Sequence, residues 1–251
     1  MLGGSLVAFS LLVAASPLPL VAIDAGHGGE HDGALGICGA KEKDLTLAIS
    51  VELARLLEAS EKAHAFLVRT TDETVELAER SSRANIAKAQ LLVSIHANSG
   101  SKPEHHGVET FFLSRGAADK RALQVAQREN GGVVPAQQVA TSTLDSILAG
   151  LSLNAAHLES QRLAFKLQEA LKTDLAARGR GVMQAPFIVL MGAEMASALV
   201  EVGFVTNPDE CTNLANAEHQ GKVAQALAGA ILAHLASENE LLAKNDVDPA
   251  G

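Results

Sequence analysis

Two histidines follow strand-like apolar runs, at positions where α/β proteins place binding groups. His27 lies in the glycine-rich residues 26–29, separated by two residues from the apolar residues 21–23, and His96 follows the largely apolar run of residues 91–95. Glycines allow the chain to turn tightly and allow a substrate to approach the backbone closely. Because ligands of such proteins bind beyond the carboxyl ends of parallel strands, we expect both imidazoles at one edge of a sheet.

Two glutamates occupy positions that are unusual without a functional reason. Glu42 stands in Lys41-Glu42-Lys43-Asp44, immediately before a predicted amphipathic helix, and Glu201 interrupts the apolar residues 198–204. A carboxylate in a buried strand is unfavourable unless it is paired or binds a metal, and no Lys or Arg is near Glu201 in the sequence. Two histidines and one glutamate are a common catalytic zinc set with one position left for water, and the remaining glutamate suits a general base.

Ordinary structural roles are also open to these residues. Glu42 could serve only as a first-turn carboxylate that interacts favourably with the helix dipole, and Glu201 could form a buried pair with an arginine such as Arg180. Asp24, at the end of the first apolar run, is expected to orient a ligand imidazole rather than to bind a metal itself. Most of the other histidines are expected to be structural or solvated, and three lie near the motifs and are candidates to line a substrate groove: His31, His105 and His106.

Composition excludes several classes of function. The 251 residues are 47% hydrophobic and 20% charged, which suffices for one domain with a full core. The net charge of −9 argues against nucleic acid or an anionic membrane surface as a partner. The glycine run lacks the Lys-Ser or Lys-Thr of a phosphate loop, and no Gly-x-Ser-x-Gly occurs. Cys38 and Cys211 could pair in an oxidising compartment, but both stand in loop-like segments and the sequence cannot place them together, so their pairing stays open.

The amino-terminal region has the character of an export segment. Residues 2–20 are uncharged and mostly apolar, and Val13-Ala14-Ala15 has the small-residue spacing of a signal-peptidase site, although no basic n-region precedes it. We therefore expect residues 1–17 to be a signal peptide. Pro17 and Pro19 interrupt the apolar run, so no stable membrane span is expected in the mature chain.

Strand-like and helix-like segments alternate along the chain. This alternation predicts an α/β fold, namely a single domain whose mixed, mostly parallel twisted sheet is flanked by helices on both faces. The expected strands are residues 20–24, 65–70, 91–96, 107–113, 186–190 and 198–202. The expected helices are residues 44–59 with Asp44 as N-cap, 75–89, 117–130, 155–177 and 223–235. Residues 207–208 predict a turn, and residues 238–251 predict a flexible tail.

Taken together and in this order, the motifs resemble the zinc-dependent N-acetylmuramoyl-L-alanine amidases of the Amidase_3 type, which are bacterial cell-wall hydrolases. The resemblance spans roughly residues 21–235 and implies a catalytic domain over residues 18–237. Four separated motifs in the family's order are far more specific than any one of them. The matching segments are Ile23-Asp24-Ala25-Gly26-His27-Gly28-Gly29, Lys41-Glu42-Lys43-Asp44, Val93-Ser94-Ile95-His96-Ala97-Asn98 and Leu199-Val200-Glu201-Val202-Gly203-Phe204-Val205-Thr206-Asn207-Pro208.

The resemblance assigns roles to the candidate residues. It implies that His27, Glu42 and His96 bind Zn²⁺ and that Glu201 is the catalytic carboxylate. The implied reaction is hydrolysis of the amide bond between N-acetylmuramic acid and L-alanine in peptidoglycan, for cell-wall remodelling or daughter-cell separation. We expect a monomer that is periplasmic or secreted to the cell wall.

Residues 131–154 depart from the alternation of strands and helices. Some Amidase_3 members carry an insert here that folds over the active site, and a glutamate from the preceding helix reaches their zinc. Glu129 is the matching residue, and as a fourth protein ligand it would occupy the position that water needs. An activator protein would then relieve this autoinhibition. The alternative is that Glu129 is an ordinary exposed helix glutamate.

Two other functions are compatible with the same residues. One is a zinc carboxypeptidase-like peptidase that acts on cell-wall peptides, because it would use the same ligand set. The other is a non-catalytic wall-binding protein. The presence of the complete set of His27, Glu42, His96 and Glu201 argues against a non-catalytic protein. The absence of Trp and Tyr also leaves few aromatic side chains on which sugars could stack.

Overall fold

The computed structural model describes two stretches of the chain: residues 17–133 and 145–246. Within these stretches, side chains are described everywhere except in two helical parts: residues 145–155 and 240–246. Parts of three expected features fall outside the described residues: residues 1–16 of the export segment, residues 134–144 of the insert and residues 247–251 of the tail.

Six strands form one sheet in the order β2-β1-β3-β6-β4-β5. All neighbouring strands run parallel except β4 and β6, which are antiparallel. The predicted mixed, mostly parallel sheet is therefore confirmed. The strands are β1 (Leu20–Ala25), β2 (His64–Leu67), β3 (Leu91–Asn98), β4 (Val108–Leu113), β5 (Gly179–Ala185) and β6 (Ala196–Phe204).

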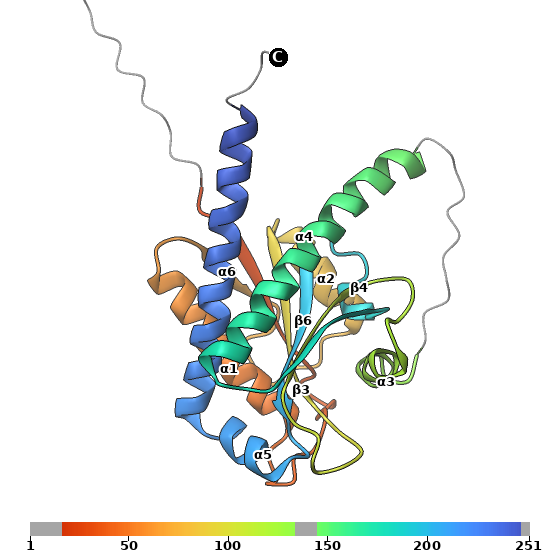
Figure 1. The fold of residues 1–251 in the computed structure, drawn as a ribbon, viewed down its shortest axis with the longest axis vertical. Coiled ribbons are helices and arrows are strands. Elements are labelled where there is room, and N and C mark those ends of the chain that lie inside the picture. Colours follow the sequence, from red (N-terminus) through yellow and green to blue (C-terminus); the bar gives the residue numbers. More distant parts are fainter. Residues whose placement is uncertain (1–16, 134–144, 247–251) are drawn as a thin grey trace, which may run out of the picture.

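Helices cover both faces of the sheet, as predicted. The helices and the 3-10 helix η1 are α1 (Glu42–Ala59), α2 (Leu77–Ile86), α3 (Lys120–Glu129), α4 (Asp145–Asp174), η1 (Ile188–Leu190), α5 (Pro208–Leu214) and α6 (Ala217–Asp246). Helices α1, α4 and α6 pack on one face, where Ile23 and Val93 are buried, and Figure 1 shows α4 and α6 crossing in front of the strands. Helices α2 and α3 and η1 pack on the other face, where Ala22 and Leu92 are buried. Because adjacent residues of a strand point to opposite faces, the central strands are continuous apolar runs.

The predicted strand at residues 186–190 is wrong. Strand β5 ends at Ala185, and η1 follows it. Asn130 holds the connection, because its side chain donates to the Pro186 carbonyl and accepts from the Ile188 N–H. Strand β5 itself carries two glycines and pairs with β4 alone at the edge of the sheet, so it lacks the apolar run of a central strand.

The carboxyl-terminal region is more helical than predicted. Asn207 caps α5 by accepting from the N–H groups of Asp209 and Glu210, and Pro208 occupies the first turn, so the predicted turn is the start of a helix. Helix α6 continues to Asp246, and residues 238–246 of the predicted flexible tail are therefore helical.

Cys38 and Cys211 form a disulfide bond, a pairing that the sequence left open. Their Cα atoms lie 5.9 Å apart although the two residues are separated by 173 positions in the sequence. The bond ties the loop between β1 and α1 to α5. Proximity between such distant residues is a property of the fold and cannot be read from cysteine spacing.

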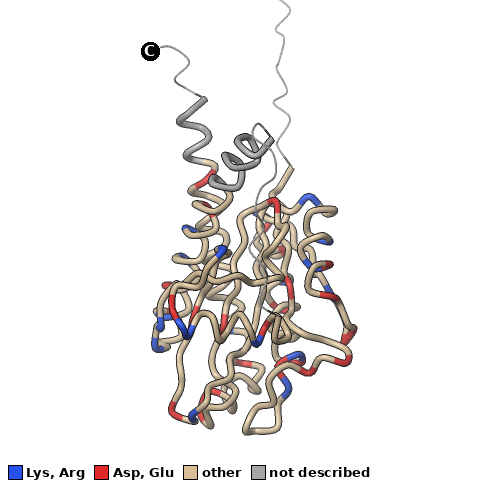
Figure 2. The backbone as a smooth tube through the Cα atoms, turned by 90° about the vertical axis from the view of Figure 1, so that its right-hand side faces the viewer, with Lys and Arg blue, Asp and Glu red and all other residues tan. Residues whose placement is uncertain are grey.

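The described chain carries charges of both signs. Figure 2 shows acidic and basic residues interspersed along it, as is typical of a solvated surface. Within residues 17–133 and 145–246, no helix combines the length and the apolar character needed to cross a membrane.

Candidate metal centre

His27 stands in a turn just past the carboxyl end of β1. Its φ is 60°, in the left-handed region that a non-glycine residue adopts only where surrounding contacts hold it. Gly33 lies farther along the same loop, and a Cβ atom there would lie 2.6 Å from both His27 Cδ2 and Glu42 Oε2. Glycine at this position therefore allows the imidazole and the carboxylate to approach each other.

Two buried arginines hold this turn. Arg69 donates to two of its backbone carbonyls, and Arg80 Nη2 donates to the His27 carbonyl over 2.8 Å. Arg80 Nη1 also donates to Asp24 Oδ1 over 2.8 Å, and Ser94 Oγ donates to Asp24 Oδ2 over 2.7 Å. Asp24 thus pairs with Arg80 and Ser94, and the prediction that it orients a ligand imidazole was wrong.

Glu42 is the first residue of α1. The helix begins after Lys41 as N-cap, so Asp44 is not the cap that the sequence predicted. The Glu42 side chain is buried, and its Oε2 accepts from the Ala34 N–H over 2.8 Å while its Oε1 accepts from the Ala97 N–H over 3.0 Å. These two bonds fix the carboxylate between the loop after His27 and strand β3.

His96 and Glu201 are register partners on the neighbouring parallel strands β3 and β6. Side chains at such paired positions lie on the same face of a sheet. Both are buried, with 4% of His96 and 0% of Glu201 exposed. Gly26 lies against the His96 ring, because a Cβ atom there would be 2.5 Å from His96 Cε1. The sheet therefore brings these two motifs together, although they are far apart in the sequence.

Four side chains, His27, Glu42, His96 and Glu129, each bring one potential ligand atom within 4.8 Å of the others. His27 Nε2 lies 3.0 Å from Glu42 Oε2 and 3.2 Å from Glu129 Oε2. His96 Nδ1 lies 3.1 Å from Glu42 Oε1 and 2.9 Å from Glu129 Oε2. The structure thus gathers all four residues that the sequence suggested as ligands. Glu129 is 5% exposed, which excludes the alternative of an ordinary exposed glutamate.

The donor set fits a divalent metal ion. Within the described part of the chain, His27 Nε2 and Glu129 Oε2 are buried without a hydrogen-bond partner, even though they lie 3.2 Å apart. Two ligand atoms of one metal ion both direct a lone pair at the ion. Such atoms lie close together without forming a hydrogen bond to each other. Imidazole and carboxylate ligands suit divalent transition metals, and an ion would satisfy both unpartnered atoms.

The electrostatics of the cluster favour an added positive charge. Burial would lower the pKa of His96, but Glu129 and Glu42 outweigh it and raise this pKa well above its ordinary value. Burial would raise the pKa of Glu129, but His96 and His27, together with Arg128, hold it well below its ordinary value. The buried carboxylates therefore keep their negative charge and hold protons on the histidines, and a metal ion that bound here would displace those protons.

Glu201 has a different environment from the four clustered residues. Burial and, next, Glu129 raise the pKa of Glu201 well above its ordinary value. Arg128 Nη2 lies 3.5 Å from Glu201 Oε1, whereas Glu201 Oε2 has no hydrogen-bond partner among the residues that the structure describes. Arg180, the partner considered from the sequence, pairs with Glu109 instead.

Arg128 is a site residue that sequence reasoning missed. Its Nε donates to Glu129 Oε1, its Nη1 to the Ser99 carbonyl and its Nη2 to Asn98 Oδ1, each over 2.9 Å. It thereby fastens α3 to the end of β3, and its place next to Glu129 was the only signal in the sequence. A neighbouring cavity of about 260 Å³ is lined by Asn98, His105, Arg121, Arg128, Arg180 and Phe204, among others.

Sequence similarity to known proteins identifies the family of this chain. The sequence profile of Amidase_3, described as N-acetylmuramoyl-L-alanine amidase, matches residues 21–233. The N-acetylmuramoyl-L-alanine amidase AmiA of Escherichia coli K12 is 33% identical over 219 residues, which cover 86% of this chain and 75% of AmiA. The protein YqiI of Bacillus subtilis 168 is 34% identical over 211 residues, which cover 84% of this chain and 82% of YqiI.

Solved structures of N-acetylmuramoyl-L-alanine amidases have the same fold as this chain. The N-acetylmuramoyl-L-alanine amidase from Clostridium difficile 630 superposes with a TM-score of 0.69 at 27% identity, covering 88% of this chain and 99% of its own. The amidase AmiC2 of Nostoc punctiforme superposes with a TM-score of 0.66 at 30% identity, again covering 88% of this chain and 99% of its own. All four sequence motifs lie within the matched residues. The chain therefore belongs to the Amidase_3 family and has peptidoglycan N-acetylmuramoyl-L-alanine amidase activity.

Proposed function

We propose that this amidase uses one Zn²⁺ ion, held by His27, Glu42 and His96, to hydrolyse the bond between N-acetylmuramic acid and L-alanine. The observation that supports this proposal is the convergence of the ligand atoms within 4.8 Å, beside the buried Glu201. Two histidines and one glutamate leave a coordination position open, which is typical of catalytic rather than structural zinc.

Bound Zn²⁺ would lower the pKa of a water molecule and polarise the scissile carbonyl group. We assign Glu201 as the general base that takes a proton from the attacking water and passes it to the leaving amine. The raised pKa of this carboxyl suits both steps, because the group must accept a proton and then release it. Its position next to His96 on the neighbouring strand supports this role.

We further propose that Glu129 is a fourth ligand that keeps the resting enzyme inactive, with residues 131–154 as the autoinhibitory insert. Glu129 Oε2 lies 3.2 Å from His27 Nε2 and 2.9 Å from His96 Nδ1, so its carboxylate competes with water for one position. Arg128 contacts both Glu129 and Glu201, and the same helix therefore engages the general base. Activation requires α3 to move, and an activator protein that binds the moving segment would cause this.

We place the mature protein outside the cytoplasm, in the periplasm or secreted to the cell wall, where peptidoglycan is found. The disulfide between Cys38 and Cys211 supports this location, because disulfides persist in oxidising compartments. Residues 1–17 would be the signal peptide and residues 18–237 the catalytic domain. We propose a monomer, because one chain supplies all four clustered residues and Glu201.

Product analysis tests this function. The Glu129→Gln variant, in which the proposed autoinhibition is relieved, is incubated with purified peptidoglycan and Zn²⁺. It should release intact stem peptides and leave sugar strands free of them. A chelator should stop the release, and added Zn²⁺ should restore it. Release of single amino acids from stem peptides would instead indicate a carboxypeptidase, and binding to peptidoglycan without release would indicate a wall-binding protein.

A further inference from the structure

A second group of metal-type ligands lies between α4 and α6. His234 Nε2 lies 3.6 Å from Glu238 Oε1 and 4.0 Å from Glu159 Oε2, and one ligand atom from each residue lies within 4.8 Å of the other two. Glu159 belongs to α4, whereas His234 and Glu238 are one turn apart on α6 and share a helix face. The packing of α4 against α6 thus brings the three side chains together.

This group is separate from the active site. Its two glutamates line a cavity together with Pro17 and Gln90, which lie just before the amino ends of β1 and β3. The active-site residues instead follow the carboxyl ends of strands. The two groups therefore lie at opposite ends of the sheet.

His234 is buried with both ring nitrogens unpartnered. Its side chain is 1% exposed, and neither Nδ1 nor Nε2 has a hydrogen-bond partner within residues 17–133 and 145–246. A buried polar side chain without a partner destabilises a fold, and an ion bound between the three residues would supply a partner for Nε2. Burial also lowers the pKa of His234, which favours the neutral imidazole that binds metals.

Neighbouring cations do not occupy the space between the three ligands. Arg162 Nη1 donates to Glu159 Oε1 over 2.6 Å, which leaves Oε2 facing His234. Lys166 Nζ donates to a backbone carbonyl and a hydroxyl of α6 rather than to either glutamate. Burial and the nearby Glu159 raise the pKa of Glu238, because the two carboxyl groups repel each other when both are charged.

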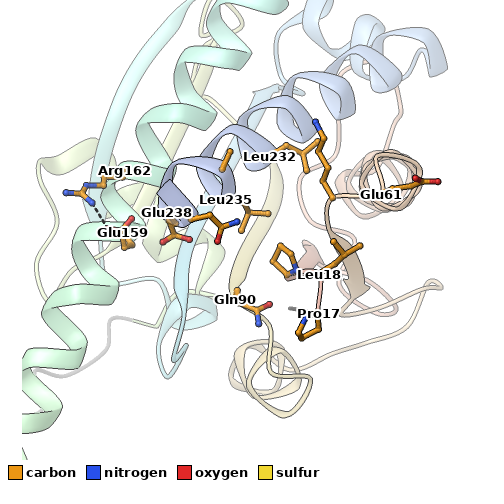
Figure 3. Close-up of a pocket in the computed structure, with 13 residues that line it drawn as sticks. Pro17, Leu18, Glu61, Gln90, Glu159, Arg162, Leu232, Leu235 and Glu238 are labelled. Carbon is orange, nitrogen blue, oxygen red and sulfur yellow. Dashed lines mark hydrogen bonds and ion pairs between the residues drawn. The ribbon is translucent and has the colours of Figure 1, made fainter. Parts of the chain in front are cut away.

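The cavity beside the group has a volume of about 930 Å³. Figure 3 shows Glu159 and Glu238 reaching toward each other from α4 and α6 at its border, with Arg162 next to Glu159. The side chains of the two glutamates are 26% and 29% exposed, so solvent reaches both. An ion could therefore enter from the cavity, and water could complete its coordination shell.

We propose that Glu159, His234 and Glu238 form a second site, for a divalent transition metal such as Zn²⁺, that clamps α4 to α6. One imidazole and two carboxylates suit Zn²⁺ with water as the fourth ligand. Ligand atoms around tetrahedral zinc lie about 3.3 Å apart. The observed separations of 3.6 and 4.0 Å, with all three ligand atoms within 4.8 Å of one another, would therefore shorten on binding through side-chain rotation. The role is structural, because the ion connects α4, whose first residues belong to the proposed insert, to the closing helix α6.

The metal content of the full chain tests this proposal. After equilibrium dialysis against Zn²⁺, the wild-type chain should hold about two equivalents and the His234→Gln variant about one. His219→Gln, on the same helix but outside the group, is the matched control and should retain both. When His27→Ala and His96→Ala remove the active-site ligands, Zn²⁺ should still raise the melting temperature, and adding His234→Gln should abolish that rise.

Glu238→Gln provides a second test, because this partly exposed side chain can be replaced without opening the core. It should lose the same equivalent of Zn²⁺ as His234→Gln. A wild-type chain that holds one equivalent would overturn the proposal, and so would retention of the second equivalent in both variants. Neither readout uses amidase activity, so failure here is independent of the proposed catalytic roles.

Discussion

Glu129 Oε2 lies 2.9 Å from His96 Nδ1, which places a carboxylate from α3 within the ligand set supplied by the loop after β1, by α1 and by β3. Arg128 strengthens this placement, because it contacts Asn98, Glu129 and Glu201 at once. Helix α3 is thus attached to the four-residue cluster through several polar contacts, and its release would expose the proposed ligands and the proposed general base together.

We expect Glu129→Gln to increase amidase activity about tenfold or more, because a neutral amide binds the metal more weakly and shifts the equilibrium toward the open enzyme. The zinc content should stay at that of the wild type. Deletion of residues 131–154 should have the same effect, and Lys120→Ala, on the exposed start of α3, is the control. Loss of both activity and zinc in Glu129→Gln would make Glu129 an essential ligand and contradict autoinhibition.

Glu201→Gln should reduce kcat by about 10²–10⁴-fold, the range for removal of a general base. Glutamine keeps the shape of the side chain but cannot accept the proton. Metal analysis of the same preparation should show zinc unchanged, since Glu201 lies outside the ligand cluster. A variant that loses its zinc would show that Glu201 is a ligand.

The acidic limb of the pH profile should lie above pH 4.5, the ordinary pKa of a glutamate carboxyl. Burial and then Glu129 raise the pKa of Glu201, and a general base acts only when deprotonated, so activity falls as the pH drops through this raised pKa. Glu129→Gln removes a negative neighbour and should move the limb of kcat/KM to lower pH. Arg128→Gln removes a positive neighbour and should move it to higher pH. If the acidic limb falls at the same pH in the wild type, Glu129→Gln and Arg128→Gln, Glu201 is excluded as the titrating group.

Arg80→Ala should lower the free energy of unfolding by about 3–5 kcal/mol, because it leaves the buried Asp24 carboxylate without its positively charged partner. It should also weaken zinc binding, since Arg80 holds the carbonyl of His27. Arg55→Ala on α1 is the control, because among the described residues its side chain bonds only to Glu52 in an exposed pair, and we expect a loss of about 1 kcal/mol or less. Urea unfolding measures the stability of both variants. Equal losses of unfolding free energy would argue that the buried Arg80–Asp24 pair contributes no more than the exposed pair.

Replacing Cys38 and Cys211 together by alanine should lower the free energy of unfolding by about 2–4 kcal/mol, the usual contribution of a disulfide. Reducing agent should destabilise the wild-type chain by a similar amount and leave the double variant unchanged. A double variant as stable as the oxidised wild type would show that the bond does not stabilise the domain.

The amino-acid sequence determined the fold class because the central strands are buried on both faces. β1, β3 and β6 therefore appear as continuous apolar runs, and the helices between them carry apolar residues at helical spacing. The same reasoning failed for the edge strand β5, which contains two glycines and has no buried run to reveal it. It also failed at Asn207, where a turn signal proved to be the cap of a helix.

The sequence likewise determined which residues could bind a metal or act as a base, because His27, Glu42, His96 and Glu201 each stand in a motif at the end or in the middle of a recognisable element. Only the tertiary structure decided how they meet. The pairing of β3 with β6 sets His96 beside Glu201, buried arginines shape the His27 turn, and Arg128 anchors Glu129 among the ligands. Such contacts join residues that are far apart in the chain, so they arise from the packing of whole elements and leave no local pattern in the sequence.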